Sequence, residues 1–493
     1  MTSYLPIQWS MSVTSLLFFS ALGAICGSFV NVLAYRLPRG MNVVSPPSAC
    51  PMCETRLTWR ENFPILGWIW LRGRCRFCKS PIAAQYPIVE VCMALLFALV
   101  FVLWYMHPSL LELADVKRDV LQPAFAKAGL DKTWPFLGAV YILLVALAAS
   151  TLIDARTFTI PLVLPWVASV AGLMAHTLHG IWVQWSLGSL PGSDDAWTIP
   201  VPEGPWLGMT IGGALGLLLA MVLLRRGLMP RSFDDYEAWE KAHLESRPEA
   251  GAPESTAAQA SPAPSLRTVL LRTLFLTGPA LALMFVGLAI GLRFGRPLEA
   301  TAIGMGIGLI VGLLLRRLVG ASGDPHWVEY PHARREMLKE LLFLAPAIGL
   351  ALVGWWLASG PLKTTTDAAP LWVRAAGGSA LGYMVGGGLI WGLRILGSLA
   401  LGREAMGQGD THLLAAAGAV LGWFDPVLAF FTAPFLGIVW AALSVVWGRV
   451  FHRQGTALPY GPHLAIAVVL VLLGRPVFAA FLTIVLGRDV QFP

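Results

Sequence analysis

The sequence has few charged residues: Asp, Glu, Lys and Arg make up 13% of the chain, whereas hydrophobic side chains make up 56%. A soluble globular protein carries about twice that share of charge, and a disordered chain has far fewer apolar residues, so both classes are excluded. The alternating segments of a membrane β-barrel are also missing, because runs such as IGGALGLLLAMVLL do not alternate. The composition therefore predicts an all-α polytopic membrane protein.

Twelve apolar stretches approach or exceed the length of about 20 residues that a helix needs to cross a bilayer. The predicted spans are 11–34, 87–106, 135–153, 161–182, 206–224, 268–292, 299–315, 341–358, 373–396, 411–423, 427–448 and 463–486. The stretch 411–423 is short for a full crossing, so a half-embedded helix stays open there. The first ten residues contain no Lys or Arg, and we expect the first segment to be a retained helix and not a removable signal.

The loops differ in charge, and this predicts their side of the membrane. Loop 36–85 contains only two glutamates but eight basic residues, namely Arg36, Arg39, Arg56, Arg60, Arg72, Arg74, Arg76 and Lys79. Basic loops stay in the cytoplasm, so we place this loop inside. Loop 184–205 has three acidic residues and no basic one, as expected outside. Such loops account for the modest net charge of +7, and no nucleic-acid partner is expected.

Four of the six cysteines lie in this basic loop, as CPMC and CRFC separated by 21 residues: Cys50, Cys53, Cys75 and Cys78. Two thiolate pairs at this separation are typical of a tetrahedral structural zinc ion. Disulfides conflict with a cytoplasmic loop. Because all four ligands come from the protein, no position remains for an activated water, so zinc is expected to organise the loop. No HExxH motif is present, which argues against a zinc protease.

Asp154 and Asp410 lie at the ends of apolar segments on the predicted cytoplasmic face. Either carboxylate alone could be an interfacial anchor, which costs little at a helix end. Gly407 and Gly409 precede Asp410 and permit unusual torsions or close helix contact. Two carboxylates at one depth, from distant segments, predict a dyad that shares a proton and supplies both acid and base for attack of water on a peptide carbonyl.

Two histidines, His176 and His179, resemble half of a metal site, but single histidines near a membrane interface are more common. A different class of function, a transporter or a membrane scaffold, would use the two aspartates as ion-site or anchor residues. Transporters usually contain internal repeats and broken helices with polar groups at mid-membrane, and the sequence shows no clear repeat. An enzyme is therefore the preferred hypothesis.

Five sequence pieces together resemble a known family. They are GSFVNVLAYRLPRG (27–40), the two cysteine pairs with AQYPIVE after them, DARTFTIP (154–161), GREAMGQGD with LLAAAGAVLGW, and ALPYGPHLA (457–465). Over residues 15–183 and 373–486 the sequence resembles the prepilin leader peptidases of type IV pilus and type II secretion systems. The resemblance implies a membrane core of eight helices in the bacterial inner membrane.

The resemblance also implies an activity. It implies an aspartic endopeptidase with Asp154 and Asp410 as catalytic residues, which removes a short basic leader from prepilins or pseudopilins at the cytoplasmic face. Bifunctional members then methylate the new N-terminus with S-adenosylmethionine, and the cysteine loop belongs to these forms. A peptidase without methylation stays open. The sequence names neither residues that bind S-adenosylmethionine nor an oligomeric state.

Two features depart from the family pattern. Thr411 and His412 stand where an apolar residue and a lysine usually follow the GxGD motif, which concerns substrate or lipid contacts. Residues 206–372 form an insertion with four apolar segments, which makes twelve helices and keeps both aspartates on one side. We divide the chain into a first transmembrane helix (1–35), a zinc-binding loop (36–86), a membrane core with Asp154 (87–205), the inserted helices with a disordered linker at 248–265, and a membrane core with the GxGD motif (373–493). The insertion could be a structural extension, a docking surface or a substrate gate.

Overall fold

The computed structural model describes residues 5–106, 122–187, 197–236, 238–239, 332–402, 404–451 and 459–486, together with a few isolated helical positions between 283 and 311. These residues form helices, with two isolated β-bridges and no named strand among them. Eight helices in this described part are long and apolar enough to cross a membrane. The predicted class, an all-α multi-pass membrane protein, is confirmed.

Eight helices correspond to the predicted core. They are α1 (Leu5–Arg36), α3 (Gln85–Tyr105), α6 (Leu130–Thr157), α7 (Val163–Leu187), α14 (Leu371–Leu401), α15 (Gln408–Leu421), α16 (Phe424–Phe451) and α17 (Tyr460–Leu486). The insertion contributes α8 (Gly204–Arg225) and α12 (Ala333–Ser359). Shorter helices are α2 (Leu66–Trp70), α13 (Lys363–Asp367) and the 3-10 turns η1 (Leu37–Arg39) and η2 (Ala124–Ala128). The predicted spans 268–292 and 299–315 lie almost entirely outside the described residues, and the linker 248–265 lies wholly outside them.

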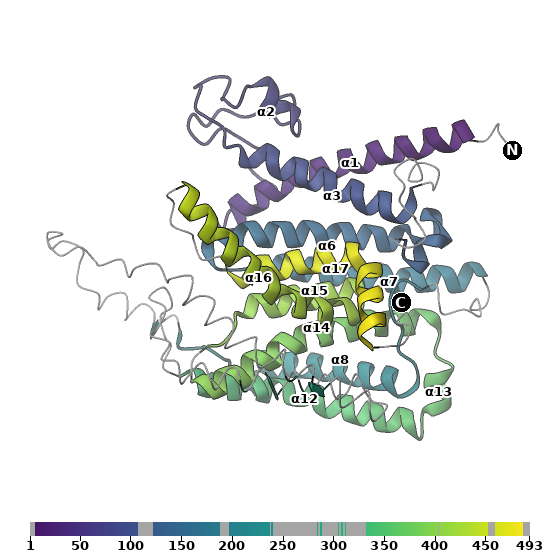
Figure 1. The fold of residues 1–493 in the computed structure, drawn as a ribbon. Helices are drawn as coiled ribbons and strands as arrows, with labels where there is room; N and C mark the ends of the chain where they lie inside the picture. The colour runs from purple at the N-terminus through teal and green to yellow at the C-terminus, as the bar shows by residue number, and fades with distance from the viewer. Residues whose placement is uncertain are drawn as a thin grey trace.

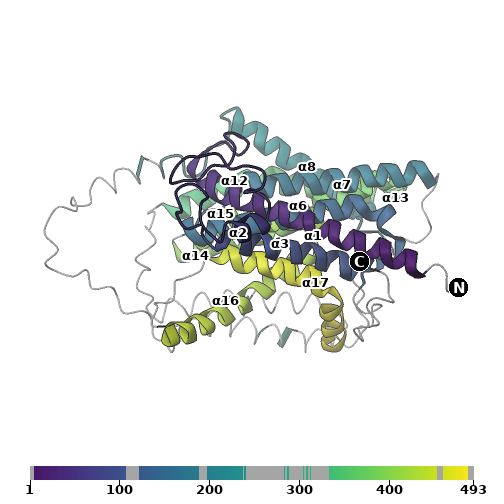
Figure 2. The ribbon, with the colours of Figure 1, turned by 90° about the horizontal axis from the view of Figure 1, so that it is seen from above.

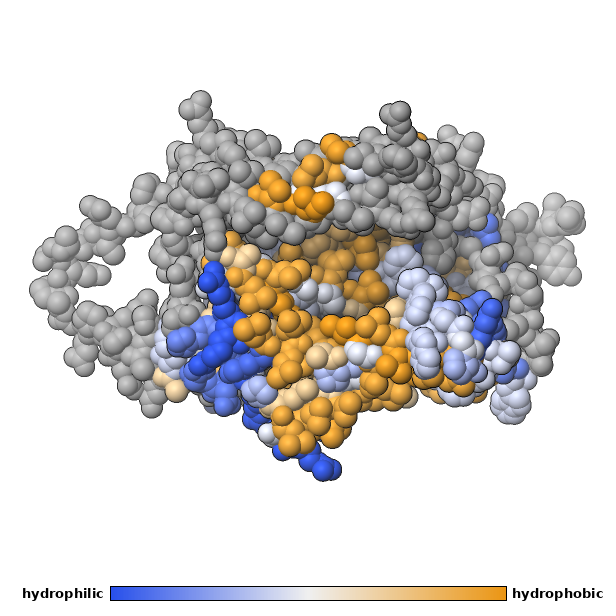
Figure 3. All heavy atoms as spheres, turned by 90° about the horizontal axis from the view of Figure 1, so that it is seen from below, coloured by the Kyte–Doolittle hydropathy of each residue, from blue (hydrophilic) through white to orange (hydrophobic). Residues whose placement is uncertain are grey.

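The helices lie side by side, with α1 and α3 along one edge, α6, α17 and α15 in the middle, and α8 and α12 along the opposite edge (Figure 1). The loop that contains α2 projects at one end of the helices (Figures 1 and 2). On the face that includes the inserted helices, apolar side chains form a band across the middle and hydrophilic ones gather at the two ends (Figure 3). Such a band is the surface that a bilayer requires.

Helix α15 is the short segment that the sequence left open. Its 14 residues are nearly all buried, and it contacts α6, α7, α14, α16 and α17. A helix of this length extends only about 21 Å, less than the thickness of a hydrocarbon core. Because other helices surround it, α15 does not need to match the thickness of the bilayer. It therefore forms the centre of the bundle.

Glycines allow neighbouring helices to approach α15 closely. A Cβ atom on Gly382 of α14 would collide with the backbone oxygen of Gly418 in α15, and one on Gly386 would collide with that of Leu414. Gly212 of α8 faces the backbone of Leu350 in α12 in the same way. Small residues at a four-residue spacing are typical of helix pairs in membranes, where backbone packing replaces the hydrophobic effect. These contacts fix the depth of α15, and with it the position of Asp410.

Candidate active site

Asp154 and Asp410 come from helix ends that meet at one place. Asp154 lies in the last turn of α6, which stops where Phe158 adopts a left-handed conformation (φ 54°) and its N–H bonds the Asp154 carbonyl at 2.9 Å. Asp410 lies in the first turn of α15, directly after Gly409 and three residues after Gly407, which precedes the helix. Both side chains are buried, and Asp410 is close enough to feel the charge of Asp154. The structure therefore brings together the two aspartates that the sequence singled out.

Gly461, in the first turn of α17, lies between the two carboxylates. A Cβ atom there would be 2.5 Å from Asp154 Oδ2 and 3.2 Å from Asp410 Oδ1, so these two oxygens are separated by no more than the sum of those distances. The backbone N–H of Gly461 lies within interaction range of the Asp154 carboxylate. The first N–H groups of a helix have no partner within the helix, which makes them available to a carboxylate.

The piece ALPYGPHLA supported the family resemblance, but the sequence gave Gly461 no role. A glycine in the first turn of a helix, next to a proline, is the only local signal that could have drawn attention to it. The neighbouring Tyr460 is partly buried and lies within electrostatic range of Asp410. The site thus contains a third segment, the start of α17, that sequence reasoning did not place there.

The two glycines before Asp410 act through contact and not through unusual torsions. Gly407 has an ordinary φ of −68°, and Gly409 is helical. A Cβ atom on Gly409 would lie 2.8 Å from the side chain of Ile160, which also approaches Gly461. Since Ile160 follows Asp154 in the motif DARTFTIP, this contact brings the two aspartate motifs together. Of the two expected reasons for these glycines, close packing is the one that Gly409 uses.

The four loop cysteines form a second cluster, in which all the Sγ atoms lie within 4.8 Å of one another. The sulfur atoms of Cys50 and Cys78 are 3.8 Å apart, and those of Cys53 and Cys75 are 3.9 Å apart. Four thiolates around a zinc ion at about 2.3 Å would be separated by about 3.8 Å, the edge of the tetrahedron. All four cysteines are free. The cluster therefore fits one tetrahedral metal ion.

Each cysteine pair lies on the same kind of turn. Cys50 N–H donates to Thr55 O at 3.0 Å, and Cys75 N–H donates to Ser80 O at 2.9 Å. A residue with left-handed torsions follows each pair, Glu54 and Lys79. Hydrogen bonds from backbone amides, first that of Met52 and then that of Cys53, lower the pKa of the Cys50 thiol to about 6. The thiolate that binds a metal is thus favoured at neutral pH.

The cysteine loop is attached to the membrane helices by buried polar groups. Glu90 of α3 accepts a hydrogen bond from Ile65 N–H at 2.6 Å, and Asn31 of α1 donates to the carbonyl of Tyr86 at 3.2 Å. Gln85, at the start of α3, donates to Asn31 at 3.4 Å and accepts a hydrogen bond from Arg156. Because Arg156 is two residues from Asp154, the basic loop and the aspartate pair lie at the same end of the bundle.

The two histidines do not form a metal site with other ligands. His176 Nε2 lies 2.9 Å from the carbonyl of Val420, and its other ring nitrogen contacts Thr198. His179 stacks on Trp197 with ring centroids 4.7 Å apart. Within the described ranges, the four cysteines are the one His, Cys, Asp and Glu group with metal-site geometry. The histidines are therefore buried packing residues, deeper than the interfacial location considered above.

Comparisons with known proteins agree with the motifs. Residues 21–104 match the family model of the Bacterial Peptidase A24 N-terminal domain. Proteins named prepilin leader peptidase/N-methyltransferase are similar to this chain: that of Myxococcus xanthus is 48% identical over 80 residues (16% of this chain, 24% of the relative), and that of Klebsiella pneumoniae is 41% identical over 100 residues (19% and 41%). That of Dickeya chrysanthemi is 27% identical over 261 residues, which cover 45% of this chain and 82% of the relative.

The resemblance drawn from the motifs is therefore confirmed: residues 21–104 match the Bacterial Peptidase A24 N-terminal domain, and the chain is similar to proteins named prepilin leader peptidase/N-methyltransferase. It spans about a quarter and two fifths of the length of the Myxococcus and Klebsiella relatives. No solved structure matches the chain.

The cysteine cluster predicts that purified protein contains about one metal ion per chain. Replacing one ligand of each pair, Cys50→Ser with Cys75→Ser, should abolish metal binding and make loop 36–85 sensitive to protease, because metal binding holds such small sites folded. Metal analysis and limited proteolysis measure both effects. The control is Cys26→Ser with Cys92→Ser, which removes two free thiols from helices and should leave the metal in place. Protein purified without chelators that contained no metal would contradict the assignment.

Proposed function

We propose that this protein is a membrane aspartic endopeptidase that removes the basic leader of type IV prepilins or pseudopilins and then methylates the new N-terminus with S-adenosylmethionine. The observation that carries the proposal is the convergence of Asp154 and Asp410 on Gly461. The two aspartates are separated by the whole insertion, yet their carboxylates meet at one backbone amide. An anchor role for each residue would not require this meeting.

The geometry suits hydrolysis of a peptide bond. Two neighbouring carboxyl groups hold one proton between them, because both cannot ionise cheaply in a buried site. The ionised group accepts a proton from water, and the water oxygen forms a bond to the peptide carbonyl carbon. The protonated group donates its proton to the carbonyl oxygen as the tetrahedral intermediate forms. The carboxyl group that took the proton from water then gives it to the leaving amine, the C–N bond breaks, and a hydroxyl of the intermediate returns its proton to the other carboxylate as the carbonyl forms again. The absence of a side chain at Gly461 leaves space beside both carboxylates.

The charge of the loops supports a location in the bacterial inner membrane with the aspartates facing the cytoplasm. The polar contacts from Asn31 through Gln85 to Arg156 connect the basic loop to the helix end that carries Asp154. Because basic loops remain in the cytoplasm, the aspartates at this end face the cytoplasm as well. The proposed substrates meet the enzyme there, with the bilayer as the other partner.

We assign the cysteine cluster a structural zinc ion, held by Cys50, Cys53, Cys75 and Cys78. We propose that the loop organised by zinc forms one wall of the methyl-donor site. It exposes Trp59, Phe63 and Trp70, flat side chains on which an adenine ring can stack. S-adenosylmethionine, when bound, supplies the methyl group that the neutral N-terminal amine accepts with loss of a proton. The work of the protein in this step is to position the amine and exclude water.

The dyad predicts that Asp154→Asn and Asp410→Asn each abolish leader removal, because each carboxylate needs the other to share the proton. The double variant should be no worse than either single one, since the two residues act as a unit. Cleavage of a purified prepilin in detergent or liposomes measures this. Methylation of a supplied mature pilin by Asp410→Asn is the control for folding. Substantial cleavage by either single variant would exclude the dyad.

Gly461 predicts a steric effect on cleavage. A methyl group in Gly461→Ala would displace the Asp154 carboxylate, so cleavage should fall about 100-fold, the effect of a misplacement of about 1 Å. Gly474→Ala on the same helix is the matched control, because its Cβ would meet only Phe478 at an ordinary 3.5 Å. Steady-state cleavage rates for the two variants, with their thermal stabilities, test this. Equal rates in both variants would show that the space beside the carboxylates is not needed.

Methylation is predicted to be separable from cleavage. Losing the cysteine pairs should abolish methyl transfer while some cleavage persists, because the loop contacts the aspartate end through α1 and α3 and contributes no carboxylate to it. Mass spectrometry of the pilin N-terminus from wild-type and variant cells measures both reactions at once. An unmethylated terminus in wild-type cells would leave a peptidase without methyltransferase activity.

A further inference from the structure

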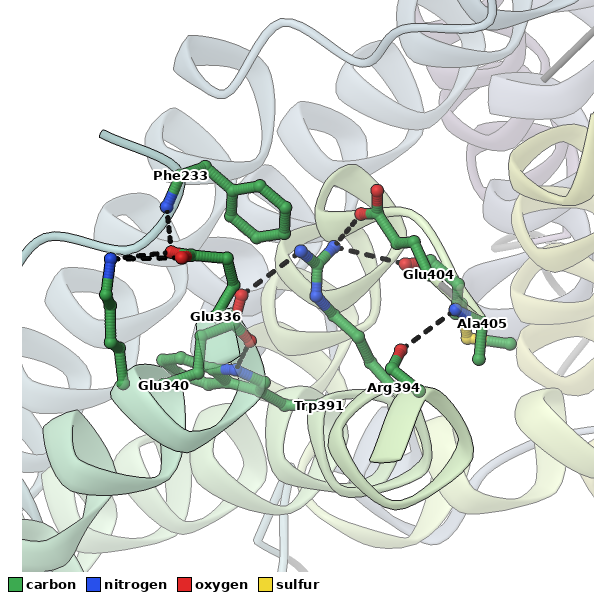
Figure 4. Close-up of polar contacts among 10 residues, drawn as sticks. Phe233, Glu336, Glu340, Trp391, Arg394, Glu404 and Ala405 are labelled. Carbon is green, nitrogen blue, oxygen red and sulfur yellow. Dashed lines mark hydrogen bonds and ion pairs between the residues drawn. The ribbon is translucent and has the colours of Figure 1, made fainter. Parts of the chain in front are cut away.

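Helix α12 of the insertion packs on α14 and is joined through it to the chain segment that leads into α15 (Figure 4). The contact is made through Arg394 of α14, whose side chain is almost completely buried. Arg394 Nη2 donates to Glu340 Oε1 of α12 at 3.1 Å, and Nη1 lies 2.7 Å from Glu404 Oε1. Nη1 also donates to the carbonyl of Met406 at 3.1 Å. One guanidinium thus joins the insertion to residues just before Gly407.

Glu340 uses both of its carboxylate oxygens. Oε1 accepts from Arg394, and Oε2 accepts from the indole N–H of Trp391 at 2.7 Å. Trp391 and Arg394 are one turn apart on α14, so Glu340 fixes the rotamers of two neighbouring side chains on that helix. Glu340 is itself only 4% exposed. Burying a carboxylate costs desolvation energy, which the attraction to a paired arginine offsets only when the geometry is good. A pair kept in spite of this cost points to a specific use.

The segment 404–406 is held at three consecutive residues. Glu404 pairs with Arg394, Ala405 N–H donates to Ser398 Oγ at 2.9 Å, and Met406 O accepts from Arg394. Helix α15 begins immediately afterwards, with Asp410 in its first turn. The charge of Arg394 also reaches Asp410. Asp410 therefore stands on a segment whose position depends on Arg394.

A second layer from the insertion encloses Arg394. Glu336, one turn before Glu340 on α12, accepts the backbone N–H of Phe233 at 2.5 Å. The Phe233 ring lies over the guanidinium, with 5.5 Å between the ring centroid and Arg394 Cζ (Figure 4). Arg335 and Lys339 neutralise Glu336. Residues after α8 and residues of α12 thus cover Arg394 together, and keep water from the pair with Glu340.

We propose that Glu340 of the inserted helix α12 is a positioning residue for Asp410, acting through Arg394 and segment 404–406. The proposal rests on the peptidase function proposed above, and gives the insertion a part in the geometry of the aspartate pair. It differs from the roles expected from the sequence, which were an extension, a docking surface or a gate.

The test is Glu340→Gln, which keeps the size of the side chain and an oxygen for Trp391 but removes the charge that holds Arg394. We expect kcat for prepilin cleavage to fall about 10- to 100-fold, because small displacements of a catalytic group have effects of this size. KM should change less than about twofold, since substrate contacts are unaltered. Methylation of a supplied mature pilin should be unchanged. Trp391→Phe, which removes only the second hydrogen bond to Glu340, should lower kcat by about two- to tenfold.

Asp425→Asn is the matched control. Asp425 and Arg475 form an equally buried pair between α16 and α17, with Asp425 Oδ2 2.5 Å from Arg475 Nη2. Asp425 follows the C-terminal end of α15, about 20 Å from Asp410 along that helix. Both variants remove the buried carboxylate partner of a buried arginine, although Arg394 keeps its pair with Glu404. Both should lower thermal stability, but Asp425→Asn should cleave with nearly wild-type kcat.

Wild-type kcat in Glu340→Gln and Trp391→Phe would overturn the positioning role. So would an equal loss of cleavage and methylation in Glu340→Gln, matched by Asp425→Asn, because this pattern reports general destabilisation. If the wild-type protein cleaved no prepilin under the same conditions, the proposed function itself would fail, and the variants would not be needed to show it.

Discussion

The site depends on the close approach of Gly461 to both carboxylates, since a Cβ atom there would be 2.5 Å from Asp154 Oδ2 and 3.2 Å from Asp410 Oδ1. Three helix ends meet there: the last turn of α6 and the first turns of α15 and α17. The first turn of a helix offers unpaired N–H groups and the positive end of the helix dipole, both of which stabilise negative charge. Backbone ends thus stabilise two carboxyl groups in a site with little water.

This arrangement constrains the packing around it. Helix α15 is shorter than the hydrocarbon core, so its own length does not determine its depth in the bilayer. Its neighbours must therefore set the position of Asp410. Glycines on α14 hold the body of α15 through backbone contacts at Gly382 and Gly418. At its start, Gly409 packs on Ile160, and segment 404–406 is tied to Arg394. The position of the Asp410 carboxylate is therefore fixed by contacts along α15 and by contacts at the start of α15. Glu340 of the insertion supports the contacts at the start.

The parts of the site that could be predicted from the sequence are those with a local pattern. The apolar runs predict the helices, the spacing of Cys50, Cys53, Cys75 and Cys78 predicts their cluster, and the loop charges place Asp154 and Asp410 on one face. Gly461 was missed because nearly every residue has a backbone N–H, so the sequence does not show which one approaches the site. Glu340 and Arg394 were missed because they lie 54 residues apart, one of them in a segment without a motif. The pairing of two buried charges from distant helices becomes visible only when the helices are packed.

The polar contacts of the cysteine loop differ from those of the aspartate pair, which bears on how the two proposed reactions would share one bundle. The cysteine loop is attached at Glu90 and Asn31, and through Gln85 to Arg156, so its anchor is on α1 and α3 with a single polar connection to the end of α6. The aspartate pair lies instead at the ends of α6, α15 and α17, next to Arg394 of α14. The hydrogen bond between Arg156 and Gln85 is a polar contact that joins the two sets. The cysteine loop and the aspartate pair thus lie at the same end of the bundle and are held by largely separate polar contacts.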